Sequence, residues 1–187
     1  MDEIVIKAMA KWPNVPDCYG WLGLDSRGDW RLRDAAVQAA GPFAQSKGEK
    51  ITHAKWIAFI GRNYASDATG CWFFQNGPQR VYVELESAPW VFRLDAAGKN
   101  LTTQTGACTA PVRFVQDEAG RLFAETQIGL GLLHSQDVPM LANQLAHWLP
   151  LIGEVSSQEI EQRYGFVKSP QQLQTHVTER VAAPWVR

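Results

Sequence analysis

Apolar and polar residues alternate along much of this chain, a pattern typical of strands that bury one face. Seven runs that read as strands, separated by turn signals, lie at residues 71–75, 79–86, 89–94, 100–105, 111–116, 121–126 and 128–133. Because consecutive runs are joined by short turns, the pattern predicts strands that pair mostly antiparallel.

One turn sequence, D-x-x-G, is used four times, at residues 25–28, 67–70, 95–98 and 117–120. An aspartate at the first position can accept hydrogen bonds from the backbone amides of the turn. A glycine at the fourth position tolerates the positive φ that closes a hairpin with a bulge. The repetition therefore predicts four similar turns, each with its glycine at positive φ.

Helical spacing of apolar residues appears in four places. The segment 52–66 places Trp56, Phe59, Ile60 and Tyr64 on one face. Further helices are expected at 138–149, 156–165 and 169–181.

Together these elements predict an α+β fold, mostly antiparallel β, with a two-part core and C-terminal helices. We expect an N-terminal hairpin-plus-helix subdomain at 1–66, a β-rich subdomain with a closing helix at 67–150, and a helical extension at 151–187. The sequence contains no low-complexity linker, so the parts are expected to pack on each other.

Composition indicates a cytoplasmic protein without a membrane anchor. The chain has 187 residues, 45% of them hydrophobic, and a formal net charge of −1, which argues against nucleic acid as a partner except as a nucleotide-like ligand. Three scattered cysteines do not form a disulfide framework, and no apolar run reaches the length of a membrane span.

The sequence contains none of the common catalytic or cofactor motifs. G-x-G-x-x-G, the Walker loop, G-x-S-x-G and H-E-x-x-H are all missing, and the four histidines, His53, His134, His147 and His176, lie far apart. We therefore predict no catalytic residue, no cofactor and no metal. Cys71 is interpreted as a buried core residue, although a cysteine paired with a distant histidine can also act as a nucleophile.

The order of a D-x-x-G hairpin, the helix beginning "ITHAKWIAFI" and the stretch "GCWFFQNGPQRVYVELESAPWVF" resembles a group of uncharacterised proteobacterial proteins classed as domains of unknown function. The resemblance covers roughly residues 19–149. It implies a duplicated β-rich core, a C-terminal half similar to pleckstrin-homology folds, and a ligand site in the cleft between the two halves.

The stretch "WFFQNGPQRVYVELE" carries the candidate site. Alternation places Arg80, Tyr82, Glu84 and Glu86 on one face of a strand, where a guanidinium beside an aromatic ring suits planar or anionic ligands. An ordinary solvated face with a cross-strand ion pair is the alternative. The basic surplus of residues 27–62, with seven basic against three acidic side chains, favours the ligand site.

If the helix at 52–66 packs beside this strand, Arg62, Arg80 and Tyr82 line one groove, with the amides of Asn76 and Gln79 at its mouth. These five residues are the predicted ligand-binding set. The partner is expected to be a small anionic or planar ligand or a peptide.

Three functional hypotheses follow. The first is a non-enzymatic ligand-binding, sensing, signalling or adaptor module that uses the groove between the halves. The second is a small enzyme in which Arg80 and Tyr82 orient the substrate and His53 or His134 acts as general base. The third is a structural protein that forms a homodimer through an open sheet edge.

Overall fold

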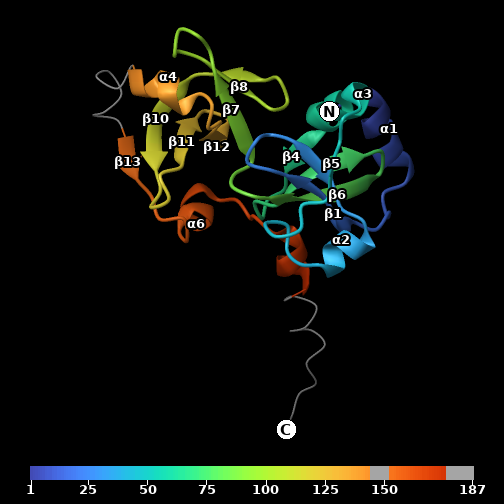
Figure 1. Cartoon of the computed structure of the whole chain (residues 1–187). Helices are drawn as coiled ribbons and strands as arrows, with labels where there is room; N and C mark the ends of the chain where they lie inside the picture. The colour runs from blue at the N-terminus through green and yellow to red at the C-terminus, as the bar shows by residue number, and fades with distance from the viewer. Residues whose placement is uncertain (144–151, 176–187) are drawn as a thin grey trace.

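The protein folds around two β-sheets (Figure 1). One large cluster of buried apolar residues draws on both sheets. The computed structural model describes residues 1–143 and 152–175. The first sheet has six strands in the order β3-β2-β1-β6-β5-β4, and the second has seven in the order β13-β10-β11-β12-β7-β8-β9.

The first sheet comprises β1 (Cys18–Leu24), β2 (Trp30–Leu32), β3 (Glu49–Lys50), β4 (Tyr64–Ser66), β5 (Trp72–Asn76) and β6 (Gln79–Leu85), accompanied by helices α1 (Glu3–Lys11), α2 (Ala35–Ala39) and α3 (Ala54–Arg62). The second comprises β7 (Trp90–Leu94), β8 (Leu101–Thr103), β9 (Cys108–Thr109), β10 (Pro111–Gln116), β11 (Leu122–Thr126), β12 (Gly129–Leu133) and β13 (Ile152–Glu154). Helix α4 (Val138–Asn143) follows β12, and α6 (Ile160–Tyr164) follows β13. A last helical segment begins at residue 170 and is described to residue 175.

Strand pairing confirms the predicted α+β class. The pairs β1·β6, β12·β7 and β10·β13 are parallel. The other described pairs are antiparallel; short turns connect their strands, except that residues 33–48 with α2 connect β2 to β3. The similarity of the C-terminal half to pleckstrin-homology folds stays a prediction.

All seven predicted strand runs correspond to observed strands, namely β5 to β8 and β10 to β12. The helix predicted over 52–66 ends at Arg62, so its extension to Tyr64 was wrong. Tyr64 begins β4, which pairs with β5, and its ring packs 4.8 Å from that of Trp72. Pairing with a neighbouring strand therefore overrides the helical spacing. The residues of the helix predicted at 138–149 that follow Asn143 lie outside the described part of the chain.

The buried apolar residues form one large cluster that draws on both sheets and two smaller clusters, one within each sheet. The large cluster contains Leu22 and Val83 from the first sheet, Phe123 and Leu132 from the second, and Ile160 from α6, all at most 6% exposed. Strands β5 and β6 belong to the first sheet, so that sheet extends beyond residue 66. The three-part division at 66 and 150 stays a prediction.

The four D-x-x-G turns have the predicted geometry. In each turn the glycine amide donates to the aspartate carbonyl, at 2.9 to 3.2 Å, and the glycine φ lies between 67° and 82°. Each aspartate carboxylate also accepts from amides of its own turn; Asp117, for example, accepts from Ala119 and Arg121. The repeated tetrapeptide is therefore explained by its structural role, which is to close the turn between two paired strands.

The face of β6 that carries Tyr82 and Glu84 is buried, which corrects the expectation of an exposed face. Tyr82 is 5% exposed and Glu84 is 2% exposed. The chain after α6 crosses this face, where the Ser169 hydroxyl and the Gln171 amide donate to the Glu84 carboxylate at 2.5 and 3.0 Å. Burial raises the pKa of Glu84, and these hydrogen bonds oppose the rise. The covering layer comes from residues far along the chain, so strand alternation alone does not predict it.

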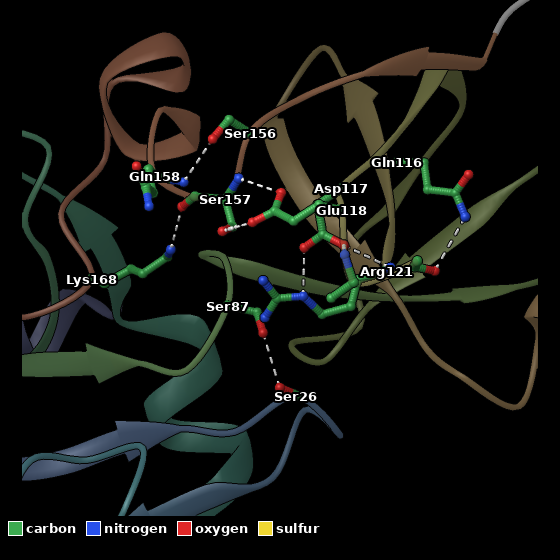
Figure 2. A network of polar contacts seen from close by, with 12 residues as sticks. Ser26, Ser87, Gln116, Asp117, Glu118, Arg121, Ser156, Ser157, Gln158 and Lys168 are labelled. Carbon is green, nitrogen blue, oxygen red and sulfur yellow. Dashed lines mark hydrogen bonds and ion pairs between the residues drawn. The ribbon is translucent and has the colours of Figure 1, made fainter.

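Polar contacts attach the α6 region to the turn after β10 (Figure 2). The hydroxyl and amide of Ser157 both donate to Glu118, and they lower the pKa of that carboxyl to about 2. Lys168 donates to the carbonyl of Ser157 at 3.4 Å. Nearby, the hydroxyls of Ser26 and Ser87 lie 2.9 Å apart and link the first turn of the first sheet to the connection into the second (Figure 2).

Candidate functional site

A hollow of about 500 Å³ lies where the connection from α1 to β1 crosses the β5–β6 hairpin. We call it the Arg80 hollow; it is lined by Met9, Pro13, Asn14, Val15, Pro16, Asp17, Gln75, Pro78 and Arg80. Its volume is in the range of small-molecule sites in proteins.

Helix α1 is held at its N-terminal end by two contacts with the end of α3. The Asp2 amide donates to Asn63 Oδ1 at 2.8 Å, and the Asp2 carboxylate forms an ion pair with Arg62 at 3.0 Å. After Lys11 the helix stops, and the proline-containing connection begins. Gln79 Nε2 donates to the Pro16 carbonyl at 3.0 Å, so this connection is fastened to β6.

Arg80 supplies a positive charge to the hollow. Its guanidinium carbon lies 4.7 Å from the centroid of the Phe73 ring, a cation–π arrangement. Within residues 1–143 and 152–175, no carboxylate forms an ion pair with Arg80. The guanidinium therefore keeps its capacity to bind an acceptor from solution.

Gln75 supplies an unused acceptor. The residue is 1% exposed, and its Nε2 donates to the Gly77 carbonyl at 2.9 Å. Its Oε1 is buried and has no hydrogen-bond partner among the described residues. Because the Gly77 carbonyl can only accept, the amide nitrogen must face it, and this orientation fixes the oxygen on the other side.

Tyr82 lies beneath the sheet surface next to this site. Its ring stacks on Tyr19, with centroids 4.6 Å apart, and its hydroxyl donates to Asp67 Oδ2 at 2.9 Å. Burial raises the pKa of Tyr82, and the Asp67 carboxylate raises it further. A hydrogen bond with the Arg80 side chain lowers this pKa and partly offsets the rise. The phenol is therefore neutral and already hydrogen-bonded.

The structure brings three of the five predicted site residues together. Asn76 and Gln79 form a pair on the β5–β6 hairpin, and Arg80 follows directly. Arg62 lies at the opposite end of α1, because it pairs with Asp2 whereas Met9 lines the hollow. About 10 Å of helix separates Asp2 from Met9 at 1.5 Å per residue. Of the five predicted residues only Arg80 lines the hollow, so Arg62 and Arg80 do not share one groove.

Sequence reasoning missed the connection 13–17 and Gln75. The prolines at 13, 16 and 78 were the available signal, since proline marks irregular chain beside a strand end. Gln75 gave no signal, because a glutamine in a strand is ordinarily exposed.

A second hollow, of about 600 Å³, lies at the edge of the second sheet; we call it the acidic hollow, and it is lined by Gln116, Asp117, Glu118, Glu154, Val155, Ser156, Glu159 and Arg163. Two of its carboxylates are already engaged, Asp117 by Arg121 at 2.6 Å and Glu118 by Ser157 (Figure 2). The Arg80 hollow is the better candidate, because its guanidinium forms no ion pair within the described part of the chain.

The described residues contain no group of three or more histidine, cysteine, aspartate or glutamate side chains that could hold a metal ion. His53 lies at the start of α3 and lines a shallow apolar hollow with Trp56 and Phe59. His134 is 8% exposed, and its Nδ1 accepts from the Gln136 amide. Neither histidine lines the Arg80 hollow. Cys71 is 4% exposed, and burial raises the pKa of its thiol, which suits a core residue.

Among residues 1–143 and 152–175, no helix has the length and apolar character needed to cross a membrane.

The fold is that of an α+β protein. Comparison with known proteins shows the family to which the chain belongs. The chain belongs to the family DUF2944, described as "Protein of unknown function (DUF2946)", whose model matches residues 1–171. The predicted resemblance is thus confirmed as far as membership of an uncharacterised family; proteobacterial origin stays a prediction. No curated protein matches the chain.

Two solved structures of DUF1285 family proteins are similar to this chain. The protein from Silicibacter pomeroyi DSS-3 is 14% identical with a TM-score of 0.47, covering 76% of this chain and 84% of its own. The protein from Shewanella baltica OS155 is 14% identical with a TM-score of 0.42, covering 66% of this chain and 91% of its own.

Proposed function

We propose that this protein is a non-enzymatic binding module that takes up a small anionic ligand in the Arg80 hollow. One observation carries the proposal: a guanidinium without an ion pair among the described residues lines a hollow of about 500 Å³. A charge-assisted hydrogen bond to such a group contributes about 1.5–3 kcal/mol, enough to prefer an anion over its neutral analogue.

Several features support binding rather than catalysis. Neither His53 nor His134 lines the hollow, and the Tyr82 phenol is held by Asp67. Within residues 1–143 and 152–175, the hollow therefore offers recognition groups without a neighbouring histidine that could act as general base. The sensing or adaptor role predicted from the sequence follows, if the hydrogen bond between Gln79 and Pro16 transmits ligand binding to the connection 13–17.

Replacing Arg80 with glutamine is expected to weaken binding of an anionic ligand by about 1–3 kcal/mol, or about 5- to 150-fold. The measurement is a thermal-shift screen of nucleotides, sugar phosphates and small carboxylic acids. A ligand at 100 times its dissociation constant stabilises the wild type by about 2.7 kcal/mol.

Arg27→Gln is the matched control, because Arg27 is exposed and does not line the hollow. It should bind like the wild type. A ligand that stabilises Arg80→Gln as much as the wild type would contradict the proposal, and so would a screen in which no anion stabilises the protein.

A further inference from the structure

The Arg80 hollow contains charges of both signs. Asp17 lines it together with Arg80, and Asp17 is exposed at the end of the connection from α1. Neither side chain forms an ion pair with another described residue. A ligand with one negative charge would satisfy Arg80 and leave Asp17 with an unfavourable like charge nearby.

The Asp17 carboxylate sets a second requirement. A carboxylate accepts hydrogen bonds but does not donate them, so Asp17 needs a donor from the ligand. An ammonium or N–H group supplies one, so the ligand is expected to carry a donor as well as an anion. Gln75 Oε1 also has no partner within the described part of the chain, but it is buried and is not counted as a ligand contact.

The remaining walls are largely apolar. Met9 and Val15 are half-buried, and Pro13, Pro16 and Pro78 contribute ring surface without amide donors. Such walls suit an aliphatic or aromatic side chain.

We propose that the ligand of the Arg80 hollow is a zwitterion, namely a free α-amino acid or a short peptide with free termini. Its carboxylate binds Arg80, its ammonium group binds Asp17, and its side chain packs on Met9 and Val15. This inference rests on the proposed function and names the ligand class of the same site.

The test is isothermal titration calorimetry on the full chain with the L-amino acids and with the dipeptides Ala-Ala and Leu-Leu. For the tightest of these, the N-acetyl derivative removes the ammonium group and the C-terminal amide removes the carboxylate. Each derivative is expected to bind at least about tenfold more weakly than the zwitterion, because each loses one charged contact. If a single amino acid binds more tightly than the dipeptides, the ligand is a free amino acid; if a dipeptide binds more tightly, the ligand is a short peptide.

Asp17→Asn is expected to weaken zwitterion binding about tenfold and to tighten binding of the N-acetyl derivative, because it removes the like charge that opposes this anion. Glu49→Gln, at an exposed glutamate of β3 away from the hollow, is the control and should change neither.

The outcomes separate the two proposals. An N-acetyl derivative that binds as tightly as the zwitterion would overturn the zwitterion inference and leave an anion site at Arg80. The same holds if no amino acid or dipeptide binds while another anion binds in an Arg80-dependent way. If no anion binds through Arg80, both proposals fail.

Discussion

Replacing Gly70 with alanine is expected to destabilise the protein by about 3–5 kcal/mol, measured as the free energy of unfolding in urea. Gly70 has φ of 82°, a conformation that strains any residue with a Cβ. An added Cβ would also lie 2.4 Å from the carbonyl oxygen of Gly165. The backbone at Gly70 and the backbone at Gly165 cannot easily move apart to make room for this atom, because the Val167 amide donates to the Gly70 carbonyl at 3.0 Å.

Gly106→Ala separates the two causes of this loss. Gly106 has a similar φ of 87°, but an added Cβ would meet no atom within 4 Å. Its substitution should therefore cost only the strain, about 1–2 kcal/mol. Equal losses for the two variants would mean that the chain after α6 does not lie against the turn at Gly70.

Replacing Arg33 with methionine is expected to cost about 3–5 kcal/mol of unfolding free energy. Arg33 is 0% exposed, and its guanidinium donates to the carbonyls of Ser46, Gly20 and Gly41 at 2.9, 3.1 and 2.7 Å. Methionine fills similar space but supplies no donor, so these carbonyls lose their partner. It also removes the positive charge that lowers the pKa of the buried Glu84 carboxyl.

Arg33→Lys keeps the charge but cannot reach three separate carbonyls from one ammonium group, so most of the loss should persist. Arg27→Met, at an exposed arginine, should change stability by less than about 0.5 kcal/mol. If Arg33→Met unfolds with the wild-type free energy, the guanidinium does not organise the connection around Gly41 and Ser46.

Local patterns were sufficient for the turns and for β10 to β12, but they did not predict β9, β13 or the parallel pairs β12·β7 and β10·β13. In the D-x-x-G turns the aspartate and the glycine act within four residues of each other, so the sequence alone predicts the geometry. The strands β10 to β12 follow one another in space as they do along the chain, so their alternation predicts both the strands and their pairing.

Prediction failed where distant segments meet. Glu84 is buried because Ser169 and Gln171 cover it, 85 and 87 residues further along the chain. Arginine is mostly found at the protein surface. Arg33 is buried, because three backbone carbonyls accept hydrogen bonds from its guanidinium. The spacing of apolar and polar residues along one strand or helix does not predict contacts between segments that lie far apart in the sequence.

The residues of the candidate site also fall into those that a local pattern predicts and those that distant segments contribute. Arg80, Gln79 and Asn76 were predicted from one hairpin and remain neighbours. Arg62 was added because α3 was expected beside the strand, and α3 does pack on β5 through Phe59 and Phe74, but Arg62 at the end of α3 pairs with Asp2 and does not line the hollow. Asp17 and Gln75 join the site only because the connection from α1 folds across the hairpin.

The central claim, that the Arg80 hollow binds a small ligand, is tested most directly by mapping amide chemical shifts in two-dimensional NMR. The titrant is the tightest ligand from the screens. The largest shifts are expected at Met9, Val15, Asp17, Gln75 and Arg80, and they should disappear in Arg80→Gln. Shifts centred on the acidic hollow or on the surface around Trp56, or shifts that persist in Arg80→Gln, would contradict the claim.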